Sequence, residues 1–70
     1  MKICSFTEPE LERFRRSCNF TAQERTAFDL KAKDYSNVQL AMEMNISEST
    51  VSVIMRRVRS KITTIMNWRD

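Results

Sequence analysis

The 70-residue sequence contains no glycine and no histidine, and it has a single proline. Sheet proteins with tight hairpins normally use glycine in their turns, so its absence favours an all-helical fold. The sequence also shows no clustered carboxylates, no glycine-rich phosphate loop and no pairing of a nucleophile with a base. These absences argue against an enzyme, and we expect neither a cofactor nor a metal.

Long apolar runs and the pattern of a signal peptide are also missing, so we expect a cytoplasmic protein with no membrane partner. Cys4 and Cys18 lack the spacing of metal ligands. Reduced thiols are therefore the favoured interpretation, and a Cys4–Cys18 disulfide is the alternative.

Acidic residues are absent from one part of the chain. Residues 1–48 contain seven basic and eight acidic residues, whereas residues 49–69 contain five basic residues and no acidic one. Positive charge confined to one segment indicates a surface that faces a polyanion. The alternative is a solvated basic helix end, which also suits the helix dipole.

Four segments begin with the same helix-start signal. In FTEPE (6–10), FTAQE (20–24) and YSNVQ (35–39), a Thr or Ser is followed three residues later by Glu or Gln, which is the capping-box pattern. In ISEST (46–50), Ser47 is the expected cap. These signals predict helices over about 8–17 and 22–33, a short helix after Ser36, and a longer helix that continues to Met66 or beyond.

Residues 36–62 have the pattern of a helix-turn-helix. Asn45 tolerates the left-handed conformation that a tight turn needs, and Ala41 is small where the two helices cross. We therefore predict an all-α fold: a small four-helix domain with a tri-helical helix-turn-helix core in residues 20–70. Residues 1–19 form an N-terminal extension that adds one helix.

The last predicted helix has two distinct faces when each residue advances by about 100°. Its apolar face points to the core and comprises Val51, Ile54, Met55, Val58, Ile62 and Ile65. The opposite face carries small residues around one arginine, with Ser60 further along, and its expected contacts to bases are Ser49, Ser52, Val53 and Arg56. The expected contacts to phosphates are Ser36, Asn37, Thr50, Arg57, Arg59 and Lys61.

Residues 20–62 resemble the DNA-binding domain of the LuxR/GerE family. The family's Leu-Thr-x-x-Glu is represented by FTAQE, its Leu-Ser-Asn by YSN at 35–37, its Ile-Ala by Leu40 and Ala41, and its Ile-Ser-Glu-x-Thr-Val by residues 46–51. The resemblance implies base contacts from the positions of Ser52, Val53 and Arg56. The promoter-reading fourth region of sigma factors is a close second match.

This sequence departs from the LuxR pattern in its turns and at its end. Asp34 and Asn45 replace two glycines, and the helix that the family commonly uses for pairing is not expected after residue 66. Two apolar groups are candidates for a homodimer contact or for helix packing: Val38 and Met42, and Ile65, Met66 and Trp68. We expect the first pair to be covered either by Leu11 and Phe14 or by a second protomer, with scattered surface side chains as the alternative.

The leading functional hypothesis is a small transcriptional regulator that binds double-stranded DNA sequence-specifically. One alternative is a sigma-like domain that binds RNA polymerase and a promoter element. Another is an adaptor that reuses the fold to bind protein. A pulldown with core polymerase separates the first two hypotheses, and the absence of any DNA binding at low salt would favour the third.

Overall fold

The computed structural model describes residues 3–67. Within that range the chain forms a short 3-10 helix, four α-helices and no strand. The all-α prediction is confirmed, as is the order of its helices. Their bounds are η1 Ile3–Ser5, α1 Glu8–Ser17, α2 Ala22–Ala32, α3 Asn37–Met44 and α4 Glu48–Met66. The sequence pattern predicted α1 with these limits and α2 with one residue more.

Each α-helix begins at the residue that the sequence signalled. The backbone N–H of Thr7 donates to the Glu10 carboxylate at 2.9 Å, and Thr21 and Glu24 form a complete capping box. Ser36 and Gln39 do the same at α3. At α4 the hydroxyl oxygen of Ser47 accepts from the Thr50 N–H at 3.2 Å. These caps satisfy N–H groups that a helix start leaves without partners.

Two helices end in the left-handed conformation without a glycine. Asp34 has φ 66°, and Asn45 has φ 56° and ψ 48°. After Asn45, the Ile46 N–H reaches back to the Ala41 carbonyl at 3.0 Å. This is the Schellman closure of a helix end, and it turns the chain sharply between α3 and α4.

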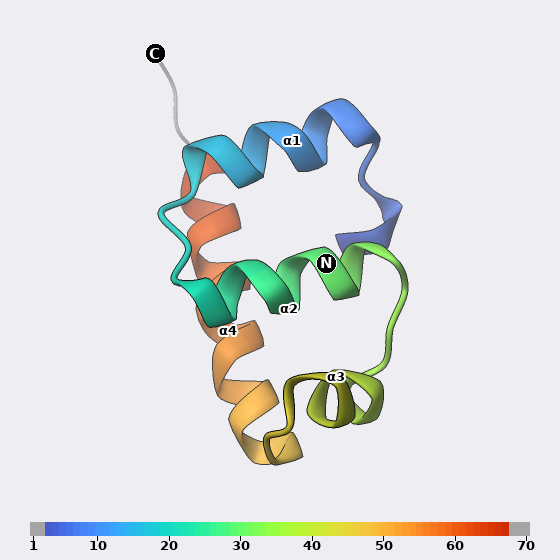
Figure 1. The fold of residues 1–70 in the computed structure, drawn as a ribbon. Helices are drawn as coiled ribbons and strands as arrows, with labels where there is room; N and C mark the ends of the chain where they lie inside the picture. Colours follow the sequence, from blue (N-terminus) through green and yellow to red (C-terminus); the bar gives the residue numbers. More distant parts are fainter. Residues whose placement is uncertain (1–2, 68–70) are drawn as a thin grey trace.

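Helix α4 is the element on which the other α-helices pack. It contacts α1, α2 and α3, while η1 packs against α2. Figure 1 shows α1 and α2 running in opposite directions across α4, with α3 and the start of α4 at one end of the molecule and α1 at the other. The molecule is elongated, with extents of 38 × 19 × 19 Å.

The N-terminal extension shares the core of the helix-turn-helix. Ile3, Leu11, Phe14 and Cys18 are buried in one cluster with the apolar residues of α2, α3 and α4. Arg15 adds a polar link, since its Nε donates to Asp29 on α2 at 3.0 Å. The extension is therefore part of the hydrophobic core and does not lie apart from it.

The expectation that Leu11 and Phe14 cover the apolar pair on α3 is wrong. Both side chains point into the core, and Val38 and Met42 remain 51% and 76% exposed. The reason is the placement of α1, which packs on α4 at the far end of the molecule from α3 (Figure 1).

Both cysteines are free thiols, as the favoured interpretation expected. Burial raises the pKa of the Cys18 thiol, so it packs as a small apolar side chain. The Sγ of Cys4 lies 3.4 Å from the Asp34 carboxylate. Among residues 3–67, no helix is both long and apolar enough to cross a membrane.

Candidate nucleic-acid interface

Helix α4 separates a core face from an exposed face. Its 19 residues make a rod of about 28 Å. Val51, Met55, Val58 and Ile62 are fully buried and Ile54 nearly so, which confirms the predicted stripe except at Ile65, which is only partly buried. The four residues expected to contact bases, Ser49, Ser52, Val53 and Arg56, are all exposed on the other side.

The exposed face is suited to close approach by a nucleic acid. Ser49 and Ser52 are short, and Val53 presents an apolar side chain that is 43% exposed. Small side chains allow a helix backbone to enter the major groove, where an arginine can bond two atoms of guanine. The arrangement therefore fits a helix that reads base edges.

Three arginines on α4 carry the free positive charge of this surface. Arg56, Arg57 and Arg59 are exposed, and among the described residues none of them forms an ion pair. Two of the three arginines of α1 differ, because Arg15 and Arg16 are paired with acidic side chains. Unpaired guanidinium groups are available to neutralise phosphates.

Lys61 occupies a different environment from these arginines. Its Nζ lies 2.5 Å from Glu24 Oε1 and 2.7 Å from the carbonyl oxygen of Asn19. The structure thus places this ammonium group in a pair within the protein, whereas the sequence had suggested a phosphate contact. Sequence reasoning assigned Glu24 only to a capping box, and no local signal connected it to a lysine 37 residues later.

The caps occupy some of the N–H groups that were expected to face phosphates. The Ser36 N–H donates to Gln39 Oε1 at 2.8 Å, and the Thr50 N–H donates to Ser47. At Ser36 the side-chain hydroxyl is the remaining donor, whereas the Thr50 hydroxyl shares a hydrogen bond with Ser47 Oγ at 2.9 Å. Asn37 is half-buried and its side-chain oxygen is buried without a hydrogen-bond partner, so contact with a phosphate would have to come from its nitrogen atoms.

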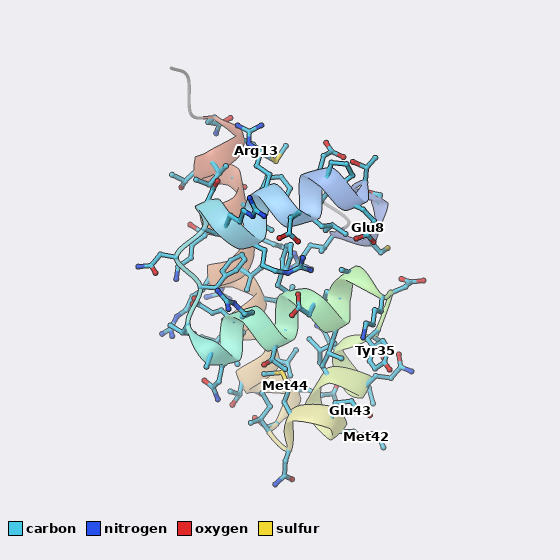
Figure 2. The ribbon with its side chains drawn as sticks, turned by 45° about the horizontal axis from the view of Figure 1, so that its top comes forward. Glu8, Arg13, Tyr35, Met42, Glu43 and Met44 are labelled. Atoms are coloured by element: carbon cyan, nitrogen blue, oxygen red, sulfur yellow. The ribbon has the colours of Figure 1, made fainter. Side chains whose placement is uncertain are left out.

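The candidate dimer residues lie at opposite ends of the molecule. Val38 and Met42 are exposed on α3, and Figure 2 shows Met42 and Glu43 at the end away from Arg13 on α1. Ile65 packs partly against the core and Met66 is 55% exposed at the end of α4. Trp68 lies outside the described residues.

The potential metal ligands of residues 3–67 are not clustered. No group of three or more potential metal ligands comes together in that range. The charged side chains of the exposed face are arginines without an adjacent nucleophile or base. The exposed face of α4 therefore concentrates positive charge, which is the character of a surface that attracts polyanions.

Comparison with protein families gives a match over residues 18–65, to the family described as GerE, bacterial regulatory proteins of the luxR family. The matched range includes α2, α3 and all but the last residue of α4. Comparison with curated proteins and with solved structures gives no match.

Proposed function

The chain belongs to the LuxR family of bacterial regulatory proteins, and we propose that it is a small transcriptional regulator that binds double-stranded DNA sequence-specifically. Membership in the family implies DNA binding and transcriptional regulation. In this proposal, α4 lies in the major groove of the DNA.

One observation carries this proposal: α4 exposes Ser49, Ser52, Val53 and Arg56 on the side of the helix that faces away from the buried stripe. We assign base contacts to these four residues. Phosphate contacts are assigned to Arg57 and Arg59 on the flanks of α4, and to Ser36, Asn37 and Thr50 at helix starts. Phosphate contacts supply affinity and register, whereas base contacts supply specificity.

The proposal is tested by selecting bound duplexes from a random DNA library and then measuring variants on the selected site. Arg56→Ala is expected to weaken binding to that site by about 1–3 kcal/mol and to relax preference at about one base pair. Arg13→Ala is the matched control, since Arg13 is an exposed arginine on α1 at the other end of the molecule (Figure 2).

The control is expected to keep the affinity and sequence preference of the wild type, because its charge lies far from the proposed groove contacts. Equal losses in the two variants would show that only the net charge matters. A selection that yields no consensus would remove the proposal of sequence-specific binding.

A further inference from the structure

We infer that Lys61 positions the recognition helix through Glu24 and does not contact a phosphate. This inference rests on the proposed function, and it assigns Lys61 a role that differs from that of the neighbouring arginines. Lys61 would thereby influence which side chains of α4 face the bases.

Three segments of the chain meet at the Lys61 ammonium group. Glu24 is only 3% exposed, and its Oε1 accepts from both Lys61 Nζ at 2.5 Å and the Thr21 N–H at 2.9 Å. The same ammonium donates to the Asn19 carbonyl at 2.7 Å. Lys61 thus joins α4 to the start of α2 and to the connection between α1 and α2.

The pair is held by the environment of the carboxylate. Burial alone would raise the pKa of Glu24, but hydrogen bonds from Lys61 and Thr21, and the charges of Lys61 and Arg57, hold it below the ordinary value. A phosphate that drew Lys61 away would leave this buried carboxylate without its principal partner, which is costly. Arg56 and Arg59 face no such cost, because neither is hydrogen-bonded within the described residues, whereas Arg57 contributes its charge to the Glu24 site.

The location of the pair explains how it affects recognition. Lys61 lies about 60° from Val58 around the helix, on a flank of the buried stripe. The close packing of the buried stripe limits rotation of α4 about its axis, and the ion pair with its two acceptors adds a directional contact that limits it further. Within residues 3–67, Lys61 is also the one α4 side chain hydrogen-bonded to another part of the fold.

A small rotation would matter at the DNA. At a radius of about 5–6 Å, a turn of roughly 20° moves a side-chain tip by about 2 Å, which exceeds the tolerance of a hydrogen bond. All four proposed base-contacting residues would move together. Loss of the pair should therefore reduce discrimination between sequences more than it reduces attraction to phosphates.

The test compares Lys61→Met, Lys61→Arg and Arg59→Met by the salt dependence of binding to the selected site and to an unrelated duplex. Measurements are made with the full chain at a temperature where circular dichroism shows each variant folded. Lys61→Met is expected to keep the salt slope of the wild type and to lower the ratio of specific to non-specific affinity by about tenfold.

Lys61→Arg, which retains a donor for both acceptors, is expected to restore most of that ratio. Arg59→Met should instead flatten the slope by about 0.9 and leave the ratio nearly unchanged, as expected for one lost phosphate contact. If Lys61→Met flattened the slope in the same way, or changed neither quantity, the inference would be overturned.

Glu24→Gln provides an independent variant should Lys61→Met not fold. We expect Glu24→Gln to lower the ratio of specific to non-specific affinity and to leave the salt slope of binding unchanged. A steeper slope would overturn the inference, because it would show that a released Lys61 binds phosphate. If the wild type binds all duplexes equally, the proposed function is wrong and this inference is wrong with it. If the wild type is selective but the variants keep its ratio of specific to non-specific affinity, the inference alone is wrong.

Discussion

Asn45 shows at the level of a single residue how a chain without glycine makes a tight turn. Its φ of 56° lies in the left-handed region, which residues other than Gly, Asn and Asp enter at a cost. Asp34 occupies the corresponding position after α2 with φ 66°. Within residues 3–67, both left-handed turns are thus made by short polar side chains.

Replacing Asn45 should show that its left-handed conformation disfavours other residue types. Asn45→Ala is expected to lower the free energy of unfolding by about 1–2 kcal/mol, whereas Asn45→Gly should preserve or slightly raise it. Urea denaturation followed by circular dichroism measures both. Gln23→Ala is the control, because Gln23 is exposed within a helix and should tolerate alanine; a similar loss there would argue against a conformational cause.

The ion pair of Glu24 should make the stability of the protein depend on pH in the acidic range. The pKa of Glu24 is lowered in the folded protein, so its ion pair contributes stability above the ordinary value of 4.5 and loses it as the pH falls through the lower, folded-state pKa. The free energy of unfolding should therefore decrease below pH 4.5. Glu24→Gln should be less stable at neutral pH and show a weaker decrease in acid. Parallel pH curves for the two proteins would contradict this assignment.

At the scale of the helix, the first turn of α4 should be kept ordered by its cap, and this turn holds residues that we propose to contact DNA. Ser47 caps the helix, and Ser49 and Thr50 follow within the first turn. Ser47→Ala is expected to cost about 1 kcal/mol of stability and to increase amide exchange in that turn. Ser60→Ala, an exposed change inside the same helix, serves as control. Unchanged exchange at residues 48–50 in Ser47→Ala would show that other contacts hold this end.

The helices could be predicted from the sequence because their signals are local. The Thr or Ser caps and their Glu or Gln partners lie three residues apart, and the apolar stripe of α4 repeats within one helix. The burial of Ile3 and the pair between Glu24 and Lys61 could not be predicted, and the exposure of Met42 was only one of the alternatives that the sequence left open. Each depends on how segments far apart in the chain are packed, and spacing along the sequence does not contain that information.

Apart from Val53 on the proposed DNA face, the exposed large apolar side chains of residues 3–67 lie at opposite ends of the molecule, Val38 and Met42 on α3 and Met66 at the tail of α4. We expect the α3 site to pair with a second protomer, since Val38 and Met42 are 51% and 76% exposed and no part of the described chain covers them. Sedimentation equilibrium should show reversible self-association. Val38→Glu/Met42→Lys should abolish it with little change in stability, because neither side chain is in the core.

Met66→Lys, at the other end, distinguishes the two sites. It should leave association intact if α3 forms the contact, and it should abolish association if the tail of α4 does. A wild type that stays monomeric at every concentration would contradict pairing through either site.

The two faces of α4 also have a consequence for natural variation. Five buried side chains secure the helix from one side, while the proposed reading positions project from the other and contribute nothing to the core. A point mutation among those positions would change the preferred operator and leave the scaffold intact. Variants with new DNA targets could therefore arise while the protein stays folded. Proteins that descend from this one should differ more in the DNA sequence that they bind than in their fold.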